Sequence, residues 1–205
     1  MLKSKSILIT PVTPSHSNKE FNFQNNDNMS YMSTSESVTS GHPDKLCDFI
    51  SDSILDECLR NDPQARVAVE VFVKGISPKN GDLPQSYIII GGEVTIKNGI
   101  VIDYEGVARR AAAEIGYKSK ELGMDAENKE TCKVLTIIGE QSSDISRGVT
   151  LGEGLFEEEG AGDQGVMYGY ATNESERYDS LMGSYMPLPI LLAHKLTLGM
   201  SKAVK

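Results

Sequence analysis

Hydrophobic side chains recur along the chain with two periods, and each period predicts a different element. Between residues 43 and 59 they recur at about every fourth position, as in an amphipathic helix that packs on a sheet. This stripe consists of Leu46, Ile50, Ile54 and Cys58. In residues 67–73, valines alternate with other residues, which is the period of a half-buried strand. A second strand is expected at 87–96, so the pattern predicts a helix followed by two strands.

The connection between the two predicted strands indicates how they pair. Lys79-Asn-Gly-Asp82 lies between them and is a strong turn sequence, so we expect an antiparallel hairpin. Gly91 and Gly92 stand inside the second strand, where glycine is typical of a bulge or of a close approach by a ligand or another backbone. Glu93 follows these glycines, and Glu70 falls on the less apolar side of the first strand. By spacing alone, Glu93 is an ordinary surface carboxylate.

The remaining periodic segments predict two more helices and one more strand. A helix is expected at 104–115, capped by the aspartate before it and ended by the glycine after it. A strand is expected at 134–138, and an apolar helix at 188–200. We expect His194 on this last helix to be a packed or capping histidine rather than a catalytic one.

Composition and charge narrow the classes of function. With 205 residues, of which 39% are hydrophobic and 24% charged, the chain has the composition of a globular protein. The net charge of −9 argues against a nucleic-acid-binding face, which needs a basic patch, and no apolar run approaches the ~20 residues of a membrane span. The three cysteines lack metal-ligand spacing, so we expect a reducing, cytoplasmic location. Residues 1–30 are rich in Ser, Thr, Asn and Pro, and we expect a disordered extension.

The start of the first predicted helix carries the strongest candidate chemistry. Pro43 suits the first turn of a helix, which puts His42 at the helix N-terminus. Unpaired N–H groups and a partial positive charge are expected there, and with Lys45 they favour a polyphosphate ligand. Asp44 either complements the helix dipole or holds the Mg²⁺ that a polyphosphate carries. From these residues alone, a Mg²⁺-dependent phosphohydrolase is one candidate function.

Five motifs follow one another between about residues 32 and 198. They are Thr34-Ser-Glu-Ser-Val38 with Gly41-His-Pro-Asp-Lys45, Gly91-Gly-Glu-Val94, Gly139-Glu-Gln-Ser-Ser-Asp-Ile145, Gly160-Ala-Gly-Asp-Gln-Gly-Val-Met-Tyr-Gly-Tyr-Ala-Thr-Asn-Glu174, and Met186-Pro187 with Leu192-Ala-His-Lys-Leu196. In composition and order they resemble the motifs of methionine adenosyltransferases, the S-adenosylmethionine synthetases. The chain therefore resembles the amino-terminal half of such an enzyme.

The resemblance implies a fold, a reaction and cofactors. The fold is α/β (α+β type), with two-layer domains of sheet and helices. The substrates are ATP and L-methionine: the methionine sulfur displaces the triphosphate from C5′, and the triphosphate is then hydrolysed to phosphate and diphosphate. The resemblance also implies Mg²⁺ and K⁺ as cofactors, and a homo-oligomer (a dimer or a dimer of dimers) whose active sites lie between subunits.

The resemblance further implies roles for residues that match the family's motifs. They are His42 and Asp163 as catalytic residues, His42 and Lys45 toward ATP, Asp44 and Glu36 toward Mg²⁺, Glu70 toward K⁺, and Glu93 and Gln141 toward methionine. Without the resemblance, the acidic and glycine-rich segment 157–165 is typical of a plain surface loop.

The domain organisation follows from the same resemblance. We expect a synthetase domain at 31–150 and the incomplete start of a second, discontinuous domain at 151–205. The segments 75–88 and 175–185 are longer than the family pattern, and we expect loop insertions there. The sequence ends at Lys205, before the family's later basic and glycine-rich segments that bind ATP. We therefore interpret the chain as part of a longer enzyme, with a non-catalytic partner of a full-length synthetase as the alternative.

Overall fold

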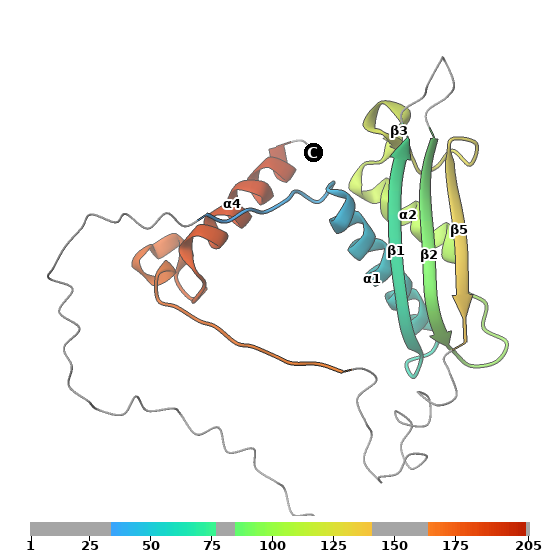
Figure 1. Ribbon diagram of the computed structural model, residues 1–205, viewed down its shortest axis with the longest axis horizontal. Coiled ribbons are helices and arrows are strands. Elements are labelled where there is room, and N and C mark those ends of the chain that lie inside the picture. Colours follow the sequence, from blue (N-terminus) through green and yellow to red (C-terminus); the bar gives the residue numbers. More distant parts are fainter. Residues whose placement is uncertain (1–33, 77–84, 141–163, 204–205) are drawn as a thin grey trace, which may run out of the picture. The chain divides into compact units, whose positions relative to one another are not determined.

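The computed structural model describes residues 34–76, 85–140 and 164–203 (Figure 1). All of them fall in the second of the two units into which the chain divides, Met1–Ser33 and Thr34–Lys205. The expected disordered extension at 1–30 and the turn at 79–82 lie outside the described residues. The elements are α1 (Pro43–Asn61), β1 (Arg66–Ile76), β2 (Gln85–Thr95), α2 (Tyr104–Ile115), β3 (Lys118–Ser119), η1 (Lys120–Leu122), β4 (Met124–Asp125), β5 (Cys132–Gly139), η2 (Ser175–Arg177), η3 (Asp179–Leu181) and α4 (Leu188–Ala203).

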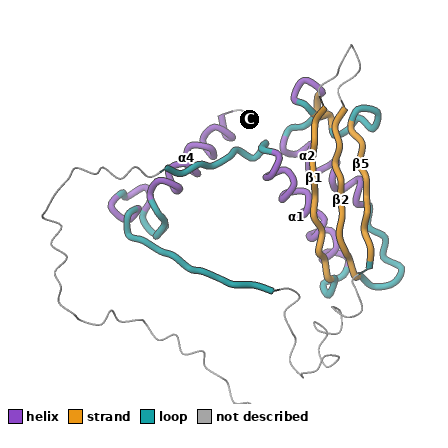
Figure 2. The backbone as a smooth tube through the Cα atoms, in the orientation of Figure 1, coloured by secondary structure: helices purple, strands orange, loops and turns teal. Residues whose placement is uncertain are grey.

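Residues 34–76 and 85–140 contain a mixed sheet (Figure 2). Its strand order is β1-β2-β5. β1 and β2 pair antiparallel from Arg66 opposite Thr95 to Ile76 opposite Gln85, so the predicted hairpin is confirmed. β5 runs parallel to β2 and completes the sheet on its other side. A small pair, β3 and β4, follows α2.

The core lies between one face of the sheet and the helices α1 and α2 (Figure 1). The predicted stripe of α1 is buried and packs with Ile88 and Ile90 of β2. From α2, Ala108 and Ala112 are fully buried, because their small side chains let the helix approach closely. Each buried Leu or Ile contributes about 1.5–3 kcal/mol relative to exposure. The predicted two-layer arrangement of sheet and helices is therefore confirmed.

The ends of α2 follow the expected capping chemistry. The Asp103 carboxylate accepts the Gly106 N–H at 2.9 Å. Gly116 has φ = 125°, and its N–H closes the helix on the Ala112 and Ala113 carbonyls, so a residue that tolerates positive φ is needed there.

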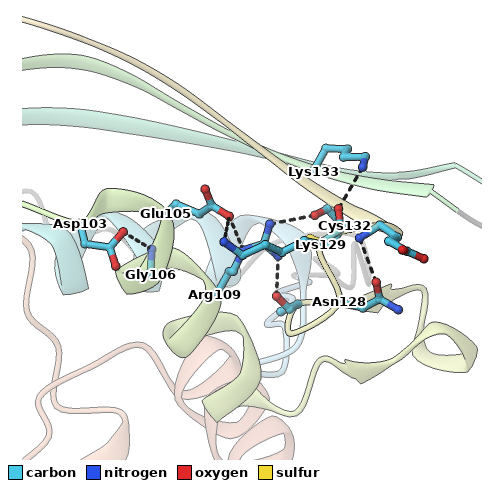
Figure 3. Close-up of polar contacts among 10 residues, drawn as sticks. Asp103, Glu105, Gly106, Arg109, Asn128, Lys129, Cys132 and Lys133 are labelled. Atoms are coloured by element: carbon cyan, nitrogen blue, oxygen red, sulfur yellow. Dashed lines mark hydrogen bonds and ion pairs between the residues drawn. The ribbon is translucent and has the colours of Figure 1, made fainter.

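An arginine of α2 ties the helix to the start of β5 (Figure 3). The Arg109 guanidinium donates to the carbonyls of Ala126 at 2.7 Å and Cys132 at 3.0 Å. Its Nε donates to Glu105 at 2.8 Å, and Lys129 lies 3.3 Å from the same carboxylate. The Arg109 hydrogen bond, reinforced by Lys129, lowers the pKa of Glu105. Since Cys132 opens β5, these contacts fix where that strand enters the sheet.

The third described range, 164–203, holds two short 3₁₀ turns and α4. The turns fall in the expected insertion at 175–185. Glu176 organises it, because its carboxylate accepts the N–H groups of Gly183 at 2.7 Å and Tyr185 at 3.0 Å. These backbone hydrogen bonds lower the pKa of Glu176. Among the described residues, no helix has the length and apolar character needed to cross a membrane.

Candidate phosphate and methionine sites

His42 caps α1 with its ring. Its backbone is extended (φ −65°, ψ 140°), and its Nδ1 accepts the Asp44 N–H at 3.2 Å. Because Nδ1 acts as an acceptor, the ring proton of this neutral form lies on Nε2. The capping role was missed in the sequence. The signal that could have revealed it is the proline at the first helical position, which makes the preceding residue the N-cap.

The first turn of α1 has fewer free N–H groups than expected. Pro43 has none, the Asp44 N–H is taken by the His42 ring, and the Leu46 N–H donates to the His42 carbonyl at 2.9 Å. The expectation of several unpaired N–H groups is therefore wrong for this helix. Lys45 keeps the one backbone donor of this turn that no contact among the described residues takes up.

Asp44 and Lys45 both face solvent at this helix end. The Asp44 side chain is 90% exposed, and its carboxylate lies 3.9 Å from His42 Nδ1. Because the cap is His42, the Asp44 oxygens remain available to a ligand. Lys45 is exposed beside a cavity of about 470 Å³ that is also lined by Ser40, Phe49 and Glu114. The helix end thus combines a ring N–H, an ammonium group and a carboxylate.

Glu70 and Glu93 lie on the face of the sheet opposite the helices. In the register of β1 and β2, Glu93 stands opposite Ala68, and Glu70 opposite Gly91. Residues directly opposite each other point to the same face, so the two glutamates are diagonal neighbours on it. Glu70 is exposed and Glu93 is half-buried. The prediction that Glu70 lies on the less apolar side of its strand is confirmed.

The two glycines before Glu93 differ in what they permit. Gly92 has φ = 134°, and a Cβ there would lie 2.0 Å from the Ala68 carbonyl oxygen. A Cβ at Gly91 would lie 3.9 Å from the Ile137 carbonyl oxygen, an ordinary contact. The predicted close approach of another backbone is therefore confirmed, at Gly92.

Comparisons with known proteins identify the family of this chain. Residues 30–143 match the family described as S-adenosylmethionine synthetase, N-terminal domain, and residues 158–205 match its central domain. The chain belongs to the S-adenosylmethionine synthetase family. It is 46% identical over 181 residues to S-adenosylmethionine synthase of Brachyspira hyodysenteriae, covering 85% of this chain and 40% of that protein. It is 49% identical over 166 residues to the synthase of Sorangium cellulosum, covering 81% of this chain and 34% of that protein.

This synthetase-family chain thus spans 34–40% of the length of these two curated relatives. Within its described residues, no group of three or more His, Cys, Asp or Glu side chains is arranged to hold a metal ion. Glu36 is exposed in the segment before α1. Its predicted share in a Mg²⁺ site with Asp44 stays a prediction.

The remaining predicted site residues are Gln141 and Asp163, and His194 was expected to have a packing role. Gln141 and Asp163 lie outside the described residues of this synthetase-family chain, so their assignments stay predictions. His194 on α4 forms a hydrogen bond through Nδ1 with the Ser37 hydroxyl at 2.8 Å. That contact suits the packing role expected for this histidine.

Proposed function

We propose that this chain forms part of a methionine adenosyltransferase, which makes S-adenosylmethionine from ATP and L-methionine and hydrolyses the triphosphate to phosphate and diphosphate. The observation that carries the proposal is the start of α1. In a chain of the synthetase family, an imidazole N–H, an ammonium group and an open carboxylate meet at one helix N-terminus. That set suits a triphosphate with its metal.

The triphosphate would be bound by His42 and Lys45. Nδ1 accepts the Asp44 N–H, so His42 would donate from Nε2, which has no hydrogen bond to any other described residue, to a phosphate or to the bridging oxygen that leaves C5′. The Lys45 ammonium and backbone N–H add charge and a second donor, and the helix dipole favours the anion. As the methionine sulfur forms its bond to C5′ and the C5′–O bond breaks, these groups stabilise the negative charge gained by the departing triphosphate.

The residues present suit the cations that the family implies. Mg²⁺ takes carboxylate, phosphate and water oxygens and is usually held by one or two carboxylates, so Asp44, whose side chain is 90% exposed, and Glu36 would hold it. Glu70 on the open face of the sheet would hold K⁺. When bound, Mg²⁺ neutralises charge on the triphosphate in both the transfer and the hydrolysis.

Methionine would be bound through the open face of the sheet. The Glu93 carboxylate would accept charge-assisted hydrogen bonds from the methionine ammonium, and Gln141 would add an amide contact. Asp163 would act beside them as a catalytic carboxylate.

A second copy of the chain would complete the site. The start of α1 belongs to the helix layer, whereas Glu70 and Glu93 lie on the other face of the sheet, so a single copy separates the two candidate sites. That open face also carries exposed apolar side chains: Phe72, Leu135 and Ile137 are 57%, 51% and 60% exposed. Such a patch is typical of a protein contact surface. A homodimer or a dimer of dimers, acting in the cytoplasm, would bury it.

The same patch supports the alternative function. A chain of this length could cover it by pairing with a full-length synthetase, as a non-catalytic or regulatory partner. The sites would then belong to that partner, and the chain would change its activity without making S-adenosylmethionine itself.

Mass spectrometry of reaction mixtures separates these functions. The complete reading frame, given ATP, L-methionine, Mg²⁺ and K⁺, should form S-adenosylmethionine, whereas residues 1–205 alone should not. Efficient turnover by the isolated chain would contradict the need for later segments. No product from the complete protein, together with changed activity of an added synthetase, would favour the regulatory alternative.

A mixing experiment tests whether two copies build each site. Asp44→Asn and Glu93→Gln proteins, each assayed at low methionine, should be weak alone. After they are unfolded and refolded together, random pairing in a dimer should restore about one quarter of wild-type activity, because hybrids contain one intact site. No recovery would mean that each copy builds its own site.

A further inference from the structure

The peptide bond just before His42 is held at both of its polar groups. Its N–H, from His42, donates to the Thr39 carbonyl at 3.0 Å. Its carbonyl, from Gly41, accepts the hydroxyl of Tyr117, which lies 76 positions later in the chain. Because both polar groups are held, rotation of this peptide is restricted, and with it the backbone that enters His42.

Tyr117 is itself anchored. It follows the glycine that ends α2, its N–H donates to the Ala112 carbonyl at 3.1 Å, and its carbonyl accepts the Ala126 N–H at 3.0 Å. The ring packs partly buried against the hydrophobic core, and this burial raises the pKa of the hydroxyl. Backbone contacts on both sides of its peptide and the packing of its ring thus hold Tyr117 where its hydroxyl can donate to Gly41.

The Gly41 carbonyl lies just outside α1. His42 precedes a proline and is extended, so the helix starts at Pro43 and the Gly41 carbonyl does not enter its hydrogen-bond ladder. It accepts the Tyr117 hydroxyl instead. No contact among the described residues takes up the Lys45 N–H.

We propose that Tyr117 is a positioning residue for triphosphate binding: by holding the Gly41 carbonyl, it fixes the backbone that carries the His42 ring beside Lys45. This inference rests on the proposed function, because it takes the start of α1 as the triphosphate site. Tyr117 acts on the site through its hydrogen bond to the Gly41 carbonyl.

The test compares Tyr117→Phe with Tyr104→Phe in the complete protein, using hydrolysis of inorganic tripolyphosphate. Tyr104 is a matched control, because it is also a half-buried tyrosine of the α2 region, and its hydroxyl makes no hydrogen bond to any described residue. Losing one hydrogen bond of about 1 kcal/mol should raise the tripolyphosphate KM of Tyr117→Phe about threefold to tenfold. Its kcat should change less than twofold, and Tyr104→Phe should keep both constants.

Melting temperatures and amide spectra complete the test. The phenylalanine ring fills the same space, so Tyr117→Phe should fold, and its ¹⁵N amide spectrum should change at Gly41, His42 and Lys45. If Tyr117→Phe is active with an unchanged KM, this inference is wrong while the proposed function stands. A loss of kcat that only accompanies a lower melting temperature would also overturn the inference, because it would show a purely structural role. Absence of both tripolyphosphate hydrolysis and S-adenosylmethionine formation in the wild-type protein would instead overturn the proposed function.

Discussion

The two ends of α1 each carry an aspartate, and the two carboxylates keep different capacity for a ligand. At the N-terminus, His42 accepts one backbone N–H through Nδ1, and the neighbouring Asp44 carboxylate is 90% exposed. At the C-terminus, Asp62 is 3% exposed. Its carboxylate accepts the Gln64 N–H at 3.1 Å and the Lys97 N–H at 3.1 Å, and lies 3.3 Å from the Lys97 ammonium.

Burial by itself would raise the pKa of Asp62. The two backbone donors and the Lys97 ammonium outweigh that effect, so its pKa is lowered. Its contacts with Lys97 join the end of α1 to the chain after β2, and its contact with Gln64 holds the turn after the helix. The difference between the two ends shows how to separate candidate ligands from structural carboxylates: a ligand needs oxygens that the fold itself leaves unoccupied.

The largest effect is expected from Asp44→Asn in the complete protein. If the carboxylate holds Mg²⁺, the rates of both adenosyl transfer and tripolyphosphate hydrolysis should fall by about 100-fold or more. Mutation of a residue that only hydrogen-bonds to a metal ligand already lowers metal affinity or activity by about 10–100-fold. Melting temperature should change little, because Asp44 is not the cap and the helix dipole accounts for only about 0.3–1 kcal/mol.

Asp56→Asn is the control for this prediction. Asp56 is exposed on the same helix, three turns after Asp44, and should keep turnover within about twofold of wild type. Equal activity of the Asp44 and Asp56 variants would show that the open N-terminal end of α1 binds no metal.

Glu93→Gln extends the comparison to the open face of the sheet. Loss of a charge-assisted hydrogen bond of roughly 1.5–3 kcal/mol should raise the methionine KM by about one to two orders of magnitude. Hydrolysis of added tripolyphosphate needs no methionine and should stay within about threefold. Steady-state kinetics on both substrates measure the two effects. Equal loss of both activities would assign Glu93 to the metal site or to the fold.

Gly92→Ala and Gly91→Ala compare a strand position where a side chain would clash with a neighbouring position where it has space. Alanine at position 92 would meet the Ala68 carbonyl at 2.0 Å and sit at φ = 134°, which should cost about 1–3 kcal/mol of unfolding free energy. Alanine at position 91 has space, so its change should stay within about 1 kcal/mol. Urea denaturation of both variants gives the values. Equal destabilisation would contradict the close approach at Gly92.

The smallest effect is expected from pH, at Asp62. Its folded-state pKa is lowered, so the carboxylate stabilises the fold above its unfolded pKa of about 3.9, and this stabilisation is lost as pH falls through the folded pKa. Asp62→Asn should therefore melt lower than wild type at pH 6, and the difference should shrink below about pH 4. A difference that is constant from pH 6 to pH 3 would mean that the charge of Asp62 contributes nothing.

Much of this protein could be predicted from local sequence. The burial of Leu46, Ile50 and Ile54 follows from a period of about four residues, and the hairpin follows from alternation with a turn between its strands. The caps of α2 follow from an aspartate and a glycine at its ends. These features depend on residues close together in the chain, so short stretches of sequence are enough to predict them. The ordered motifs were sufficient to indicate the family.

Other features depended on contacts between distant segments. The parallel pairing of β5 with β2, the contact of Tyr117 with Gly41 across 76 positions, and that of Asp62 with Lys97 across 35 positions have no local signature. The sequence also indicated Glu70 and Glu93 as candidates without showing that they share one face, because that depends on the register of two strands. Sequence determined the family and named the candidate site residues. The tertiary structure decided which polar groups of the described residues the fold satisfies, because only packing brings distant donors and acceptors together.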